Sequence, residues 1–267
     1  MSRDPLGMWG DAGNRGTAQN YCGNNPVNRL DPLGLAQLDL DQQGKLLDAI
    51  EKRLDADLPA KNGTKASLGG AAESVRSNLR HQRKLLAVAR KLKDRKLQDD
   101  MMSNGKLRFV DDSDGELGDG KRAETTESGS VLVNLDENKT AKAALKKGDY
   151  DAAAEALLPT LIHEGYHLLK RHNRKAGTFE ELIRREAEAW WIEAVYFDRF
   201  IGGDLNPEER QDLADDLGVD LYKEFLDTSV HRLKDGSVCH YVMGRDWFGI
   251  ALPVLRRVYD YYKKYFR

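Results

Sequence analysis

The spacing of apolar residues predicts that most of the chain after residue 35 is helical. Within Leu38–Leu58, apolar residues recur every three or four positions, as on one face of an amphipathic helix: Leu46, Leu47, Ile50 and Leu54. Pro59–Gly70 contains the turn-forming sequences KNG and GG and is predicted to be a loop. A second, longer and strongly basic helix is predicted over Ala71–Met102, with a core stripe formed by Leu79, Leu86 and Leu92.

Two short apolar runs in the middle of the chain predict strands, because each is bounded by turn-forming Asp and Gly residues. These runs are Leu107–Val110 and Ser130–Leu135. The sequence DDSDGELGDG between them lacks the ligand spacing of a calcium-binding loop, so we expect only a turn-rich connection there. Helical patterns resume in Leu157–His172, where Pro159 suits the first turn, and in Phe179–Phe200. The predicted fold class is therefore α+β and mainly helical, with an N-terminal helical segment and a small β-sheet.

The first 35 residues differ from the rest in composition and predict a separate segment. They hold three of the seven Pro and six of the 24 Gly residues, and they show no helical period. The sequence DPLG occurs twice in them, at Asp4–Gly7 and Asp31–Gly34. We therefore divide the chain into residues 1–35, a helical segment at 36–100, and a domain at 101–267 that carries the candidate chemistry.

Composition and charge narrow the class of protein. The 42 Lys and Arg residues against 44 Asp and Glu give a formal net charge of −2, so the chain has no overall basic field for nucleic acid. Its longest apolar run, WFGIALPVL, is far shorter than the roughly 20 residues that span a bilayer. The N-terminal MSRDPLG lacks the apolar region of a signal peptide. The chain has only two cysteines, Cys22 and Cys239, which are too few for a disulfide scaffold. We expect a soluble globular protein with no membrane span and no signal peptide.

The strongest candidate for chemistry is the run from His163 to His167, HEGYH, which matches the HExxH pattern inside a predicted helix. Residues four apart lie about one turn apart on the same helix face, so both imidazoles can bind one ion at about 2.0–2.1 Å. Glu164 is rotated by about 100° from His163, which places it where it can take a proton from a metal-bound water. The pattern predicts a zinc site with His163 and His167 as ligands and Glu164 as the general base.

A catalytic zinc site also needs a third protein ligand and leaves a fourth position for water. A metzincin-type ligand would be a His six residues after His167, with a Gly between them. Here His172 follows by five residues and no Gly intervenes, so that class is excluded. The alternative is a Glu on the following helix, Phe179–Phe200, which is rich in acids: Glu180, Glu181, Glu186, Glu188 and Glu193.

This helix pair resembles the glu-zincin metallopeptidases, in which the ligand Glu lies in a Glu-x-x-Ala context on the second helix. Only Glu186, followed by Ala189, matches that context, so the resemblance implies that Glu186 is the third metal ligand. Glu188 lies about 200° around the helix from Glu186 and cannot serve the same site. Glu193 lies seven residues after Glu186 and faces the same way, which makes it a candidate hydrogen-bond acceptor for a ligand imidazole. The resemblance also implies a zincin-like fold, with the small sheet beside the active-site helix.

The ligand set implies a zinc-dependent peptidase. Glu164 would take the proton of the attacking water and deliver it to the leaving amine, while zinc and a nearby donor stabilise the oxyanion. Candidates for that donor lie in a predicted strand or hairpin near the C-terminus: His231, His240, Tyr241 and Arg245. Ser130–Leu135 is predicted to be the edge of the sheet beside the active-site helix, where an extended peptide adds as a strand.

The N-terminal segment resembles the end of the core of Rhs/YD-repeat proteins. The match is best in Pro26–Leu35, PVNRLDPLGL, which has the family's Pro, Asp-Pro, Gly and Leu in place. In that family the motif closes a large β-shell, self-cleavage follows the final Leu, and a variable toxin domain comes next. The resemblance implies processing after Leu35, with Asp4 and Asp31 matching aspartates that the family associates with it.

Together the two resemblances imply a polymorphic toxin whose active domain is a metallopeptidase. Such an effector is delivered by a secretion machine, commonly type VI, into a target cell, where it acts in the cytoplasm on a protein or peptide. The family also implies an Rhs β-shell in the full-length protein and a cognate immunity protein that protects the producer. No nucleic acid partner is expected, and a cell-wall peptidase is a variant of the same interpretation.

Two other functions remain open at this stage. One is a toxin of another class, such as a nuclease that binds nucleic acid through the basic helix Arg76–Lys96 and in which the HExxH sequence is accidental. That protein would need magnesium bound by carboxylates. The other is a non-catalytic binding module in which zinc is structural, and a closed site with four protein ligands would favour it.

Overall fold

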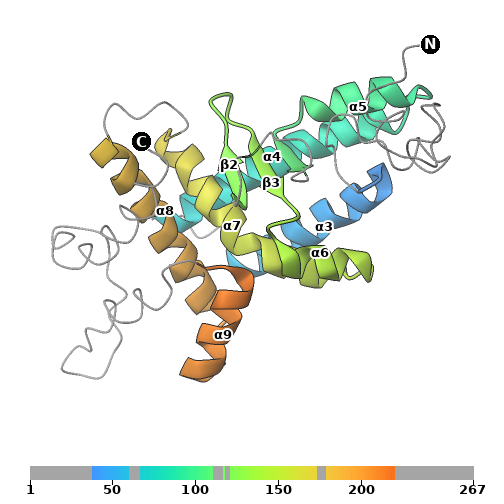
Figure 1. Cartoon of the computed structure of the whole chain (residues 1–267). Coiled ribbons are helices and arrows are strands. Elements are labelled where there is room, and N and C mark those ends of the chain that lie inside the picture. The colour runs from blue at the N-terminus through green and yellow to red at the C-terminus, as the bar shows by residue number, and fades with distance from the viewer. Residues whose placement is uncertain (1–37, 60–66, 111–116, 118–120, 173–178, 220–267) are drawn as a thin grey trace, which may run out of the picture.

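The computed structural model describes residues 38–59, 67–110, 117, 121–172 and 179–219. These residues form a mainly helical fold with a small three-stranded sheet (Figure 1), as the sequence predicts. In chain order the elements are α3 (Leu40–Asp57), α4 (Ser67–Ala89), α5 (Arg95–Ser103), β1 (Leu107–Val110), β2 (Ala123–Thr125), β3 (Val131–Asn134), α6 (Lys139–Lys146), α7 (Tyr150–Lys170), α8 (Phe179–Phe200) and α9 (Pro207–Leu217).

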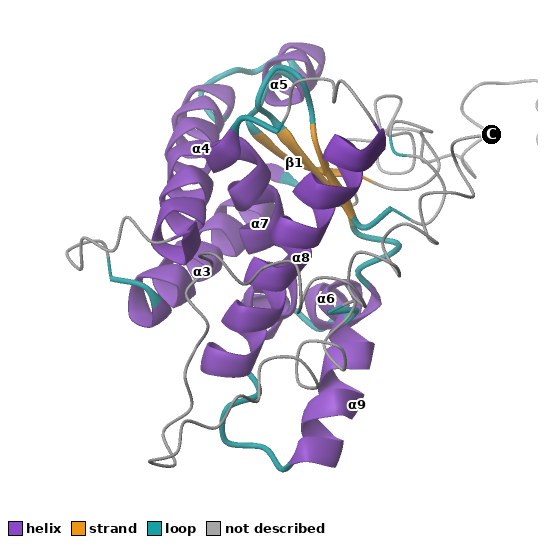
Figure 2. Ribbon diagram, turned by 90° about the vertical axis from the view of Figure 1, so that its left-hand side faces the viewer, coloured by secondary structure: helices purple, strands orange, loops and turns teal. Residues whose placement is uncertain are grey.

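Helix α7 runs through the middle of the fold and carries the HExxH pattern. It packs against α3, α4, α6 and α8, and β2 lies along it (Figures 1 and 2). Asp149 caps its N-terminus by accepting a hydrogen bond from the backbone N–H of Ala152. The prediction that Pro159 stands in the first turn is wrong, because α7 begins at Tyr150 and Pro159 lies buried in its interior. Ala153, Ala154 and Ala156 precede Pro159, are buried and favour helix, so the helix extends further back than the motif alone indicates.

The N-terminal helices agree with the sequence in part. Helix α3 confirms the helix predicted over Leu38–Leu58, and a capping box of Asp39 and Gln42 starts it. The single helix predicted over Ala71–Met102 is wrong, since the chain forms α4 and α5 with a turn between them. Asp94 accepts a hydrogen bond from the N–H of Leu97 and so begins a new helix, which a continuous helix would not allow. Helix α4 also starts at Ser67, inside the predicted loop.

Strand β3 is the central strand of the sheet, in the order β1-β3-β2. It pairs parallel with β1 and antiparallel with β2. Both strands predicted from the sequence are confirmed, but the prediction that Ser130–Leu135 forms the edge beside the active-site helix is wrong. Its apolar side chains are buried on both faces: Val131 and Val133 join the main core, and Leu132 packs in a second cluster. The strand beside α7 is β2. Its short polar sequence, AET, has no apolar pattern from which a strand could be predicted.

The arginines of α4, and Arg90 directly after it, are paired with acids, chiefly on α3. Arg76 is only 4% exposed, and its guanidinium contacts Asp55 at 2.8 Å and the backbone carbonyls of Leu54 and Leu58. Further ion pairs join Arg80 to Glu73, Arg83 to Asp48 and Glu51, and Arg90 to Asp41. Much of the positive charge of the predicted basic helix is therefore balanced within the fold.

A polar network ties α8 to α3 and α7 and so positions the second helix of the site. The Tyr196 hydroxyl donates to Asp57 at 2.6 Å, and Arg53 pairs with Asp57 at 3.0 Å. Arg53 also reaches Glu155 on α7 and donates to the carbonyl of Phe200 at the end of α8. Of the helices that the structure describes, none has both the length and the apolar character of a membrane-spanning segment.

Candidate metal centre

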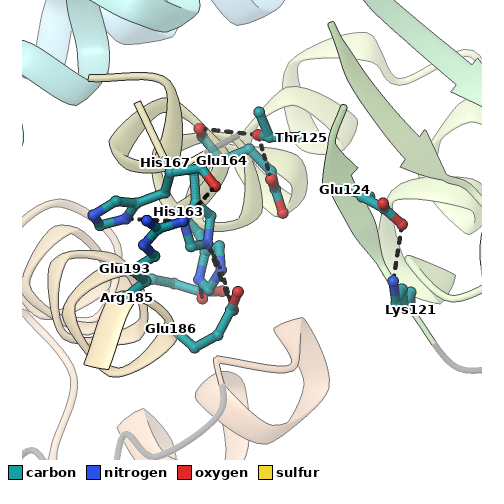
Figure 3. Close-up of polar contacts among 10 residues, drawn as sticks. Lys121, Glu124, Thr125, His163, Glu164, His167, Arg185, Glu186 and Glu193 are labelled. Carbon is teal, nitrogen blue, oxygen red and sulfur yellow. Dashed lines mark hydrogen bonds and ion pairs between the residues drawn. The ribbon is translucent and has the colours of Figure 1, made fainter. Parts of the chain in front are cut away.

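The two histidines of the HExxH pattern lie on one face of α7, directed towards α8 (Figure 3). His163 and His167 are each 7% exposed, and their Nε2 atoms are 3.1 Å apart. Gly165 lies between the two histidines, and a Cβ there would come within 2.5 Å of the backbone carbonyl oxygen of Ala71 on α4. The absence of a side chain at Gly165 thus lets α4 pass close behind α7 and holds the histidine-bearing turn in place.

Glu186 of α8 completes a group of three ligand atoms. Its Oε2 lies 3.6 Å from His163 Nε2 and 3.5 Å from His167 Nε2. Two ligand atoms at about 2.0–2.1 Å from a tetrahedral ion lie about 3.3–3.4 Å apart, so the observed triangle of 3.1, 3.5 and 3.6 Å has the size that such an ion needs. Among the described residues, the buried His163 and His167 and the half-buried Glu186 form a group that can hold a metal ion.

Glu193 lies about two turns after Glu186 on α8 and orients the imidazole of His163. Its Oε2 is 3.0 Å from His163 Nδ1, and Glu193 is 2% exposed. Because a carboxylate only accepts hydrogen bonds, Nδ1 of His163 donates, which leaves Nε2 as the nitrogen that binds an ion once its own proton has left. The other oxygen, Oε1, lies 3.7 Å from a guanidinium nitrogen of Arg122, at the start of β2.

The electrostatics of the centre favour a cation. Burial alone would lower the pKa of His163, but hydrogen bonds to Glu186 and Glu193 and the nearby negative charges raise it to about 10. Burial would raise the pKa of Glu186, yet its hydrogen bonds and charge interactions with His167 and His163 hold it well below its usual value. Glu186 thus contacts both imidazoles, Glu193 contacts that of His163, and the nearby Glu164 adds negative charge. A proton or a metal ion satisfies that charge, so the two compete for the site.

Glu164 lies on a different side of α7 from the histidines, facing the sheet (Figure 3). It is 5% exposed, and its Oε2 accepts a hydrogen bond of 2.6 Å from the hydroxyl of Thr125, on β2. The same hydroxyl lies 3.2 Å from the backbone carbonyl of Glu164. One side chain of the edge strand therefore fixes the carboxylate that the sequence nominates as the general base.

Glu188 points away from the centre, as its position on the helix predicts. Its Oε2 accepts a hydrogen bond of 2.7 Å from the hydroxyl of Tyr166. Burial and this carboxylate raise the pKa of Tyr166 above its usual value, so the hydroxyl stays protonated. Of the two neighbouring acids on α8, the one with access to both histidines is Glu186.

Sequence reasoning missed two residues that touch the site. Thr125 lies in a three-residue polar strand with no clear alternation, and only its pairing with β3 places it beside Glu164. The sequence pattern tests His172 only as a metal ligand, but its Nδ1 lies 3.4 Å from Nδ1 of His167. Burial and the neighbouring charges of His167 and Arg185 lower the pKa of His172 to about 4, so its imidazole is neutral near pH 7.

Several predicted site residues lie outside the described residues. These are the candidate oxyanion donors His231, His240, Tyr241 and Arg245, and the candidate processing residues Asp4, Asp31 and Leu35. Their roles stay predictions from the sequence.

Comparisons with known proteins gave no match, whether to a protein-family model, a curated protein or a solved structure. The function of this chain therefore has to be inferred from its motifs and from the geometry of the centre.

Proposed function

We propose that this chain is a zinc-dependent peptidase with a zincin-like fold. The observation that carries the proposal is the triangle of the buried His163 and His167 with Glu186, together with Glu164, which follows His163 directly and is held by Thr125. Two imidazole nitrogens and one carboxylate oxygen are ligands that suit zinc. Three protein ligands leave a fourth position for water, which favours a catalytic over a purely structural ion.

Glu164, Thr125 and Glu193 would have different roles in peptide-bond hydrolysis. A zinc ion held by His163, His167 and Glu186 would supply Lewis acidity for the attacking water and the substrate carbonyl. Glu164 would accept a proton from the attacking water and deliver it to the leaving amine as the peptide bond breaks. Thr125 keeps the Glu164 carboxylate oriented, and Glu193 keeps the His163 ring oriented, so neither has to reorganise during the reaction.

The edge strand offers a place for the substrate. Among the described strands, β2 pairs on one side only, with β3, and its residues are partly exposed. An extended peptide can add to the free side of such a strand through backbone hydrogen bonds. Because β2 carries Thr125, a peptide bound there lies next to the general base.

We further propose that the peptidase acts as a toxin. The support is the resemblance of Pro26–Leu35 to the end of an Rhs core, which in that family precedes a toxin domain. The chain would then be released from a β-shell after Leu35, delivered into the cytoplasm of a target cell, and neutralised in the producer by an immunity protein. The ion pairs of the α4 arginines argue against the nuclease alternative, since they leave less positive charge for a phosphate backbone.

Replacing the general base tests this function. Glu164→Gln keeps the size of the side chain and its contact with Thr125 but cannot accept a proton, so we expect zinc to stay bound while activity falls by about 10²–10⁴-fold. The wild-type chain and E164Q would be expressed in the bacterial cytoplasm, and growth and newly formed protein N-termini would be compared. E188Q is the matched control, because Glu188 lies on the opposite face of α8. Equal toxicity of E164Q and wild type, with the same new N-termini, would show that HEGYH is not the catalytic centre.

A further inference from the structure

His172 lies directly after α7 and reaches back to the second ligand histidine. Its Nδ1 is 3.4 Å from Nδ1 of His167, and the two ring centroids are 5.5 Å apart with the planes inclined by 59°. This nitrogen of His167 is the one turned away from the metal-binding triangle, since its Nε2 faces His163 and Glu186. His172 therefore contacts Nδ1 of His167 in the same way that Glu193 contacts Nδ1 of His163.

Three contacts hold His172 in this place. Arg171 adopts a left-handed conformation, with φ 56° and ψ 33°, and turns the chain back at the end of α7. The N–H of His172 then donates to the carbonyl of His167 at 2.8 Å, and Arg185 of α8 donates to the carbonyl of His172 at 3.3 Å. The ring packs edge-on against Tyr166, with centroids 6.0 Å apart. Both helices of the centre thus fix this histidine.

The chemistry of the ligand explains what His172 contributes. A neutral imidazole that binds a metal through Nε2 carries its hydrogen on Nδ1, and that hydrogen needs an acceptor. We propose that His172 is a positioning residue that accepts the Nδ1 hydrogen bond of His167 and so fixes the tautomer and orientation of this ligand. His172 then carries its own hydrogen on Nε2 and uses Nδ1 as the acceptor. The inference rests on the proposed metal centre but not on the identity of the substrate.

The two ligand histidines are therefore supported in different ways. A carboxylate partner makes a ligand imidazole more basic, whereas an imidazole partner mainly orients it. We expect Glu193 to affect both the strength and the geometry of metal binding, and His172 to affect chiefly its geometry. Loss of such outer contacts weakens metal affinity by about 10–100-fold.

The dissociation constant for zinc tests the inference without any substrate. It would be measured on the full chain by competition with a chromophoric chelator, for wild type, H172F and H172Q. Phe keeps an aromatic ring against Tyr166 but has no acceptor, so H172F should weaken zinc binding by about 10–100-fold. Gln offers an amide oxygen as acceptor, so H172Q should recover most of that loss. H81F is the matched control, because His81 is an exposed histidine of α4 and should leave zinc affinity unchanged.

The outcomes separate this inference from the function that it rests on. Tight zinc binding by wild type together with unchanged affinity in H172F overturns the role of His172 and leaves the proposed peptidase intact. Failure of the wild type itself to bind zinc overturns the metal centre and the inference with it. If H172F and H172Q lose zinc equally while both keep the wild-type circular dichroism spectrum, hydrogen-bond acceptance by His172 is refuted.

Discussion

The interface of α3 with α4 and the interface of α7 with α8 both carry many charged side chains, but they balance the charge differently. Between α3 and α4, each of the partly buried guanidiniums of Arg76 and Arg83 has a carboxylate within ion-pair distance. Between α7 and α8, Glu186 contacts the imidazoles of His163 and His167, and Glu193 contacts that of His163. The guanidinium charges at the first interface are paired with carboxylates of the protein, whereas the carboxylates at the second need a proton or a metal ion to balance them.

The charges between α3 and α4 stabilise the fold, whereas those between α7 and α8 belong to the proposed metal centre. A buried charge costs several kcal/mol unless it is paired, by the usual order of magnitude. The arginine pairs meet that requirement with groups of the protein itself, so they fix how α3 lies on α4. The acids of α7 and α8 would meet it with a proton or a metal ion, as the proposed metal centre requires. Variants of the two interfaces should therefore differ in whether they alter zinc binding or only stability.

The largest effect is expected from the acids and histidines of the triangle. His163→Ala, His167→Ala and Glu186→Ala each leave two protein ligands, so bound zinc, expected at about one per chain, should be lost together with activity. Glu193→Ala should weaken zinc binding by about 10–100-fold, and Glu188→Ala should leave it nearly intact. Metal analysis of the purified variants checks this order. Loss of zinc in Glu188→Ala with retention in Glu186→Ala would show that α8 presents its other face to the centre.

The pH dependence of zinc binding sharpens the comparison next. In the metal-free protein the pKa of His163 is raised to about 10, so this imidazole carries a proton near neutral pH and must lose it when the ion binds. The affinity for zinc should therefore rise by about tenfold per pH unit between pH 7 and 9. The same shift stabilises the metal-free fold fully below about pH 6.5, and that stability is lost as the pH rises through 10. Zinc titrations at constant ionic strength measure the slope, and a flat profile would contradict the displacement of a proton.

A smaller effect is expected at the contact between Thr125 and Glu164. Thr125→Val has nearly the same shape but no hydroxyl, and a hydrogen bond to a charged group contributes about 1.5–3 kcal/mol. We expect kcat to fall by about 10–100-fold with little change in KM or zinc affinity, and Thr125→Ser to restore most of it. Steady-state kinetics on a substrate taken from the new N-termini measures this. A fall in zinc affinity equal to the fall in kcat would instead mean that Thr125 supports the fold of the centre.

The smallest effects on the centre are expected from the arginines of the other interface. Arg76→Ala removes the partners of two backbone carbonyls and should lower the free energy of unfolding by about 1–3 kcal/mol. Arg80→Ala, which breaks an exposed pair with Glu73, should change it by less than about 1 kcal/mol. Urea unfolding measures both, and zinc affinity should be unchanged in each. A weakened metal site in Arg76→Ala would show that the two interfaces are coupled.

Local patterns along the chain were enough for the elements that carry the ligands. The four-residue spacing of His163 and His167, and the seven-residue spacing of Glu186 and Glu193, determine helix faces by the geometry of a single helix. Such spacing predicts which side chains share a face without any knowledge of the fold. For the same reason Glu188 could be assigned to the other face, where it contacts Tyr166.

Tertiary structure decided everything that depends on contacts between distant segments. Which strand lies beside α7 follows from burial of β3 on both faces, and this leaves the short β2, with Thr125, at the edge. The break between α4 and α5, and the place of Pro159 inside α7, depend on capping and on burial of whole helix faces. The return of His172 to His167 requires one residue in a left-handed conformation, at Arg171. Periodicity reports only neighbours along one element, whereas these contacts arise from packing between elements, to which no spacing in the sequence corresponds.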